Sequence, residues 1–177
     1  NEGGIEPFLR GLAAQKSQKI DHLVVDDVRN FLFGFPGAGG FDLPALNIQR
    51  GRDHGLPSYN DARAAFGLPA ATSFSDVSSN AEIQRRLASA YGSPGDMDIW
   101  VAGLAEDPLA DSQLGPLFQA ILVEQFTRLR DGDRFWYQWQ FSPREQAEIE
   151  ALTLAEIIRL NTTIGNELND DVFRVTR

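Results

Sequence analysis

The chain has 177 residues, enough for one globular domain with a hydrophobic core. It carries 25 acidic and 16 basic residues, and the resulting net charge of -9 disfavours binding to nucleic acid. There is no cysteine, which excludes disulfides, thiolate metal sites and a cysteine nucleophile, and no apolar run approaches the ~18 residues of a membrane span.

Helical periodicity dominates the chain. Apolar residues at helical spacing predict a helix over residues 21–33 and another over residues 80–91, the latter ended by Gly92 as a C-terminal cap. The longest apolar stripe runs from Leu114 to Leu129. His22 falls early in the first of these helices, where we expect it to face solvent.

Two further helix starts are marked by capping boxes. Ser142 and Glu145 flank a proline at the first helical position, and Thr153 and Glu156 repeat the pattern. Breaks are expected at residues 34–40, 68–79, 93–95 and 131–133. No alternating run is long enough to propose a sheet, so the expected fold class is all-α.

The densest polar segment runs from Asn47 to Asn60 and follows an apolar stretch. Its two arginines, Arg50 and Arg52, should each face an anion, and Asp53 can serve only one of them fully. The pattern favours an internal salt-bridge cluster and leaves open an anionic ligand, since arginine binds oxyanions through two parallel hydrogen bonds.

Three other features have alternative interpretations. A histidine such as His54, which stands beside Asp53, can act as a general base or as a metal ligand. A hydrogen-bonded structural role is favoured for it. The turn at residues 131–133 lacks the further acidic positions of a calcium loop, so it is interpreted as a helix end. The aromatic residues at 135–137 and 139 are expected to pack in the core rather than to form a ligand surface.

Residues 43–60, which read LPALNIQRGRDHGLPSYN, closely resemble the signature of the animal-type haem peroxidases. These form the peroxidase branch of the peroxidase–cyclooxygenase superfamily, with myeloperoxidase- and peroxidasin-like members. Residues 2–12, 91–104, 129–137 and 157–162 also resemble family segments in the expected order. The resemblance spans nearly the whole chain and implies that residues 1–177 are the C-terminal helical portion of one peroxidase catalytic domain.

The resemblance assigns roles to four residues. Asn47 matches the asparagine that hydrogen-bonds the proximal histidine ring, a contact that fixes its tautomer and tunes the ligand. Arg50 matches an arginine beside a haem propionate, and Leu43 and Leu46 match apolar positions on the proximal wall. Arg52, Asp53 and His54 match positions interpreted as structural.

The remaining haem machinery lies upstream in the family: the distal histidine and arginine, the haem-linking carboxylates, the calcium loop and the proximal histidine. None has a counterpart in this sequence, so we expect no metal ligand here, and calcium only in the upstream part. The first residue is Asn1 and no signal-peptide pattern follows, so we expect the sequence to begin inside a longer product.

The function implied by the resemblance is a haem enzyme that uses hydrogen peroxide to oxidise halides or organic donors. The upstream part of the domain is then this segment's partner, and the isolated chain is expected to be inactive. The alternatives are a non-catalytic helical fragment that binds no haem alone, and a fatty-acid oxygenase of the same superfamily, which the Arg52–Gly55 string disfavours. The family's habits imply a secreted or extracellular location, and the absence of cysteine favours a bacterial source.

Overall fold

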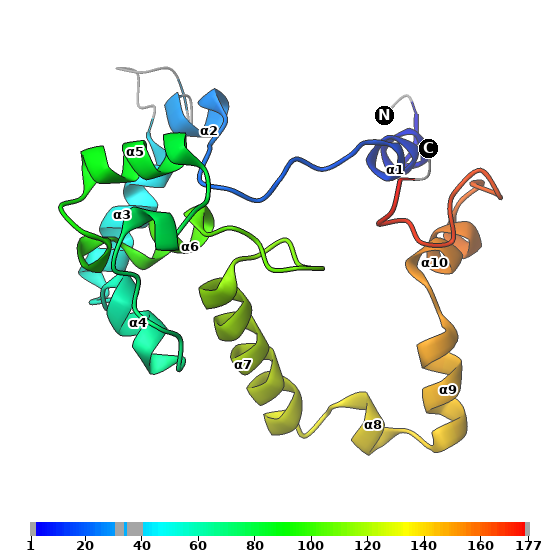
Figure 1. Cartoon of the computed structure of the whole chain (residues 1–177). Helices are drawn as coiled ribbons and strands as arrows, with labels where there is room; N and C mark the ends of the chain where they lie inside the picture. The colour runs from blue at the N-terminus through cyan, green and yellow to red at the C-terminus, as the bar shows by residue number, and fades with distance from the viewer. Residues whose placement is uncertain (1–2, 31–33, 35–40, 176–177) are drawn as a thin grey trace. The chain divides into compact units, whose positions relative to one another are not determined.

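The computed structural model describes residues 3–30, 34 and 41–175, and the described residues are helical without a β-strand. The chain divides into two compact units, residues 19–128 and residues 1–18 with 129–177. The division falls within helix α7 (Pro116–Gly132). Figure 1 labels the helices of both units. The expectation of an all-α fold is confirmed.

The larger unit contains most of the short helices. They are α2 (Asp26–Asn30), α3 (Leu43–Asp53), α4 (Tyr59–Ala65), the 3-10 turn η1 (Phe74–Asp76), α5 (Ala81–Ala90), the 3-10 turn η2 (Pro94–Asp96), α6 (Ile99–Ala105) and most of α7. Side-chain caps start three of them. Asp42, Ser58 and Asn80 each accept a hydrogen bond from a backbone N–H in the first turn of α3, α4 and α5.

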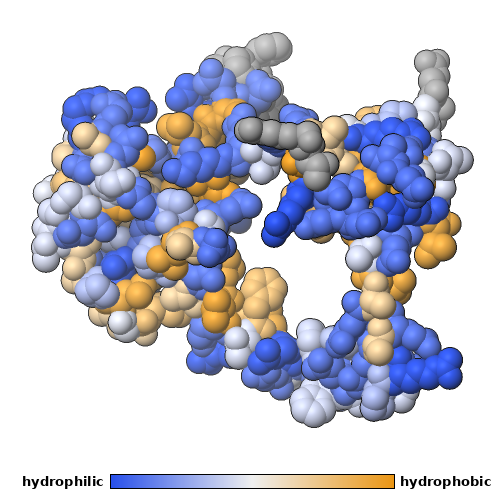
Figure 2. Space-filling view, turned by 45° about the vertical axis from the view of Figure 1, so that its right-hand side comes forward, coloured by the Kyte–Doolittle hydropathy of each residue, from blue (hydrophilic) through white to orange (hydrophobic). Residues whose placement is uncertain are grey.

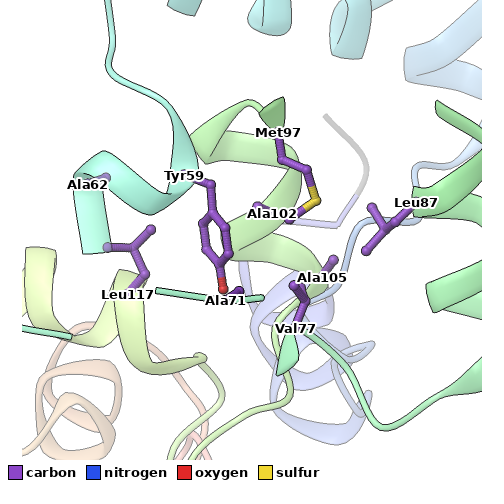
Figure 3. Close-up of a cluster of buried hydrophobic side chains, with 9 residues drawn as sticks. All are labelled: Tyr59, Ala62, Ala71, Val77, Leu87, Met97, Ala102, Ala105 and Leu117. Carbon is purple, nitrogen blue, oxygen red and sulfur yellow. The ribbon is translucent and has the colours of Figure 1, made fainter. Parts of the chain in front are cut away.

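The core of this unit gathers around a buried tyrosine. Tyr59, Met97 and Leu117 are among its fully buried side chains, and alanines line the close contacts between the helices. Figure 3 shows the tyrosine ring from α4 among the side chains of α6 and α7. At Gly103 an added Cβ would lie 2.2 Å from the Phe118 ring, so only glycine allows α6 to approach α7 this closely.

The smaller unit contains α1 (Glu6–Ala14), α8 (Tyr137–Gln140), α9 (Pro143–Ala151) and α10 (Leu154–Asn161). Both predicted capping boxes are confirmed, with Ser142 starting α9 and Thr153 starting α10. Ala155 and Ile164 belong to a small buried cluster against which α1 packs. The ion pair of Arg10 with Glu167 at 3.0 Å adds a polar contact between α1 and the C-terminal segment.

Of three predicted boundaries, one is confirmed, one is wrong and one lies largely outside the described residues. The long helix at 114–129 is confirmed as α7, and it ends in the turn predicted at 131–133. The helix predicted from residue 21 begins only at Asp26, because Asp21 accepts a hydrogen bond from the Leu23 N–H and forms a local turn instead. Residues 31–33, and the loop predicted at 34–40 apart from Gly34, lie outside the described residues.

The predicted glycine cap of α5 is wrong. The helix ends at Tyr91, whose backbone is extended, with φ -128° and ψ 144°. The chain therefore leaves the helix without a left-handed residue, and Gly92 has no capping role.

Apolar side chains also lie on the surface. Phe135 is 66 % and Trp139 72 % exposed, so the expectation that this aromatic run packs in the core is wrong for this chain. Val123 and Phe126 are likewise exposed on α7, because only the start of its apolar stripe meets the core. Figure 2 shows orange apolar areas at the surface. Large exposed apolar areas are typical of surfaces that contact another polypeptide.

The described helices include none that combines the length and the apolar character needed to cross a membrane.

Candidate functional site on helix α3

The predicted site residues share one side of α3. Asp42 caps the helix, its Oδ1 accepting from the Ala45 N–H at 3.0 Å. At 3.6 residues per turn, Leu43, Leu46, Asn47 and Arg50 fall within about 100° of one another around the helix axis. We call these four residues the α3 stripe. Leu46 is 43 % exposed and Asn47 is half-buried.

The glycines and histidine that follow this stripe end the helix. The Gly55 N–H donates to the Arg52 carbonyl and the Leu56 N–H to the Gly51 carbonyl, both at 3.0 Å, which is a Schellman motif. Gly55 takes the left-handed conformation that the motif requires, with φ 67°. Leu56 folds back so far that a Cβ on Gly51 would lie 3.3 Å from its side chain.

His54 completes this helix end. Its backbone N–H and its ring Nδ1 both lie within hydrogen-bond distance of the Arg50 carbonyl oxygen, at 3.0 and 2.9 Å. A carbonyl can only accept, so Nδ1 donates. The favoured structural role for His54 agrees with this geometry.

Arg52 has an anion, but it is not the neighbouring aspartate. Its guanidinium donates to both oxygens of Asp98, at 2.9 and 2.8 Å, and Tyr91 donates its hydroxyl to the same carboxylate at 2.8 Å. Asp53 instead accepts from the Gln49 amide at 2.7 Å. The ion pair between Arg52 and Asp98 thus links α3 to the residue that precedes α6.

These contacts change the acid–base properties of the linked groups. Hydrogen bonds from the Arg52 guanidinium and then from Tyr91, opposed by burial, hold the pKa of Asp98 below its usual value. Burial, followed by the hydrogen bond to Asp98, raises the pKa of Tyr91 to about 12. At neutral pH Asp98 is therefore charged and Tyr91 is neutral.

The two polar residues of the α3 stripe differ from their neighbours. Gln49, Arg52, Asp53 and His54 all have partners, as given above. Within the described ranges, neither the Asn47 amide nor the Arg50 guanidinium has a side-chain hydrogen bond or an ion pair. The predicted internal salt-bridge cluster is therefore right for Arg52 and wrong for Arg50.

Asn47 and Arg50 also line a common pocket of about 420 Å³. The rest of its lining comes from the same helix, from the segment after it and from the start of α6: Ile48, Gly51, Arg52, His54, Leu56, Pro57, Asp98, Ile99 and Trp100. Leu43 and Leu46 lie on the same stripe but not on this pocket. The structure thus brings together the two polar residues of the predicted site.

Asp98 and Trp100 were not singled out as site residues from the sequence. Asp98 lies 46 residues from Arg52, and no local pattern links them. Residues 91–104 were identified only as a segment that resembles the family, and the resemblance assigns no role to any single residue in it.

His22 differs from its sequence-based expectation. It precedes α2 and is half-buried, and its ring Nδ1 is buried with no hydrogen-bond partner among the residues that the structure describes. The expectation that it faces solvent in a helix is wrong, because α2 begins only at Asp26 and His22 is half-buried before it.

Among the residues that the structure describes, His, Asp and Glu form no cluster of three or more that could hold a metal ion. The chemistry available on α3 is that of hydrogen-bond donors and acceptors and one unpaired cation.

The all-α fold agrees with the class of protein that comparisons with known proteins indicate. The family model described as animal haem peroxidase matches residues 1–173. The chain belongs to this family, and the resemblance seen in the sequence is confirmed.

Individual relatives support the same assignment. The chain is 45% identical to peroxinectin A of Dictyostelium discoideum over 171 residues, and 40% identical to human myeloperoxidase over 179 residues. Each match covers 97% of this chain, and 32% and 24% of those proteins. The chain thus spans about a third or less of the curated relatives it matches.

Solved structures give the same fold. Peroxidase A from Dictyostelium discoideum superposes with a TM-score of 0.87 at 46% identity, over 97% of this chain and 34% of that one. A fatty acid alpha-dioxygenase from Oryza sativa gives a TM-score of 0.63 at 23% identity over 70% of this chain and 21% of that one, which shows a shared fold alone.

Proposed function

We propose that this chain is the C-terminal part of a haem-dependent peroxidase domain that uses hydrogen peroxide to oxidise halide or organic donors. In this proposal residues 1–177 belong to one catalytic domain whose upstream part supplies the proximal histidine. The α3 stripe forms part of the proximal wall, with Asn47 facing the histidine ring and Arg50 facing a haem propionate.

The main support is the set of polar side chains on α3 that lack internal partners. The Asn47 amide is half-buried and the Arg50 guanidinium is exposed, so both are available to bond to groups supplied by a ligand or by another part of the domain. Asn47 and Arg50 are the two members of the 47–54 polar segment left in this state. An imidazole N–H and a carboxylate would satisfy both.

The residues on the stripe fit a haem in chemical type. The Asn47 amide oxygen can accept the second N–H of an iron-bound imidazole, which fixes its tautomer and raises its basicity. Arg50 can donate charge-assisted hydrogen bonds to a propionate, while Leu43 and Leu46 offer apolar contact to a porphyrin face. A bound haem supplies the redox chemistry of peroxide reduction.

The fatty-acid oxygenase alternative has weaker support. Human myeloperoxidase is 40% and peroxidase A of Dictyostelium discoideum 46% identical to this chain, whereas the dioxygenase structure is 23% identical. Oxygen uptake by the full-length protein on linoleate or arachidonate, without peroxide, would favour the oxygenase.

The proposal is tested on the full-length haem protein with Asn47→Ala and Arg50→Gln. Loss of a hydrogen-bond partner behind a metal ligand typically lowers activity 10–100-fold, so Asn47→Ala should lower kcat/KM for guaiacol oxidation by about that factor. Arg50→Gln should weaken haem retention in gel filtration, since a charge-assisted contact is lost.

Gln49→Ala is the matched control, because Gln49 carries an amide on the same helix but pairs with Asp53. It should retain wild-type haem content and activity. If all three variants behave like wild type, or if the control loses as much activity as Asn47→Ala, the assigned roles on α3 are wrong.

The proposal extends to partners and location. The upstream part of the domain is the macromolecular partner, hydrogen peroxide and small donors are the substrates, and calcium, where present, is held by the upstream part. An extracellular or secreted location is proposed from the family resemblance, and fractionation of cells that express the full-length protein tests it.

A further inference from the structure

We propose that Asp98 is a positioning residue for the proximal side of the haem site, which fixes α3 against α6 and so sets the direction of the Asn47 amide. This inference rests on the proposed role of Asn47. Asp98 itself is not assigned a contact with haem or substrate.

Asp98 is the point at which three parts of the larger unit meet. Its carboxylate accepts both hydrogen bonds from Arg52 on α3 and one from Tyr91 at the end of α5. Its backbone forms a β-bridge with Ser58, the N-cap of α4, and the neighbouring Tyr59 N–H donates to the Met97 carbonyl at 3.0 Å.

The pair with Arg52 constrains orientation as well as distance. Two parallel N–H···O bonds between a planar guanidinium and a carboxylate fix the relative direction of both groups. Arg52 projects from the opposite side of α3 to the stripe, about half a turn away from Leu43 by helical spacing. A change in the position of the Arg52–Asp98 ion pair would therefore rotate or tilt α3, the helix that carries Asn47.

Asp98 also begins the facing wall of the pocket. Ile99 and Trp100 follow it directly in α6 and line the pocket together with Asn47 and Arg50. A displacement of Asp98 would therefore move both walls relative to each other. The Asp98 side chain is 16% exposed against 59% for Arg52, so the carboxylate is the fixed partner and the arginine reaches to it.

The test is resonance Raman spectroscopy of the iron–imidazole stretch in the full-length ferrous haem protein. A hydrogen bond to the second ring nitrogen strengthens the ligand, so its loss in Asn47→Ala should lower the frequency. Asp98→Asn should lower it in the same direction by a smaller amount, because the amide of residue 47 is misdirected rather than removed. Tyr91→Phe, which removes one of three hydrogen bonds to Asp98, should give a still smaller shift.

Asp107→Asn is the matched control. Asp107 is a half-buried aspartate of the same unit, hydrogen-bonded to the Ser78 hydroxyl at 2.9 Å and the Ser79 N–H at 2.6 Å, and it does not line the pocket. A general loosening of the unit would affect both aspartate variants equally. The control should keep the wild-type frequency.

The outcomes separate this inference from the proposed function. If Asn47→Ala shifts the band and Asp98→Asn does not, Asp98 has no positioning role and the role of Asn47 stands. An unchanged band in Asn47→Ala overturns both. Equal shifts in Asp98→Asn and Asp107→Asn overturn the inference as well.

If Asp98→Asn fails to bind haem, the Arg52→Lys variant, which retains both charges, replaces it in the test. Arg52→Lys keeps the ion pair but loses the two-pronged geometry, so a shifted band is expected. If both Arg52→Lys and Tyr91→Phe keep the wild-type band, the inference is overturned.

Discussion

The Arg63 guanidinium and the Glu106 carboxylate form an ion pair inside the larger unit, with Nη1 2.6 Å from Oε1 and side chains 9% and 2% exposed. Tyr59 donates its hydroxyl to the same carboxylate oxygen at 2.7 Å, and the Leu117 N–H donates to the other at 2.8 Å. One carboxylate thereby joins α4, the end of α6 and the start of α7.

The first prediction is that Glu106→Gln is strongly destabilising. It leaves the buried Arg63 charge without its counter-ion, and breaking a buried pair in this way costs about 3–5 kcal/mol. Urea unfolding followed by circular dichroism measures the loss. Glu82→Gln, which removes an exposed partner of Arg85, is the control and should change stability little. Equal effects of the two substitutions would contradict a central role for the buried pair.

The second prediction concerns the end of α3. Gly55→Ala forces a side chain into the left-handed conformation and should destabilise the protein by about 1–2 kcal/mol. Gly55→Asn should cost less, because asparagine tolerates this conformation better. Thermal unfolding of the two variants gives the comparison. Indistinguishable melting temperatures for Gly55→Ala and wild type would show that the helix does not end as described.

The third prediction is a pH dependence. The Asp98 pKa is lowered in the folded state, chiefly by the hydrogen bonds from Arg52. Its contribution to stability is therefore present above the unfolded pKa of about 3.9 and is lost as the pH falls through the lower folded value. The difference in unfolding free energy between wild type and Asp98→Asn should shrink over that acidic window. A difference that stays constant from neutral to acid pH would contradict the charged contact.

The sequence predicted those features correctly that depend on residues only a few positions apart. The capping boxes at Ser142 and Thr153 need only residues three positions apart, and both were predicted correctly. No helix was predicted over residues 43–53, and the helix face that Asn47 and Arg50 share therefore became visible only in the structure. Their identification as site residues came from the family resemblance.

The wrong predictions concern features that depend on which of several possible partners a residue meets in the fold. Asp53 was expected to serve one of the two arginines, but it accepts from Gln49, and Arg52 pairs with Asp98 at the start of α6. The helix expected from residue 21 lost its first turn to the hydrogen bond between Asp21 and Leu23. Hydrophobicity predicted that Trp139 is buried, yet burial also needs a surface to pack against, and among the described residues Trp139 stays 72% exposed.

The fourth prediction concerns the isolated chain. The family resemblance places the iron ligand in the upstream part of the domain, and apolar residues of this chain such as Phe126 and Trp139 are exposed. The purified 177-residue polypeptide mixed with haemin should show no sharp Soret band and no guaiacol oxidation. Absorbance titration with haemin tests this directly. Clear turnover by the isolated chain would contradict the view that an upstream part completes the site.

The most direct measurement is a crystal structure of the full-length protein with haem. The account predicts that the Asn47 amide oxygen lies about 2.7–3.2 Å from the second ring nitrogen of the proximal histidine, with the Arg50 guanidinium within hydrogen-bond distance of a propionate oxygen. A structure that places either side chain outside the haem cavity would contradict it.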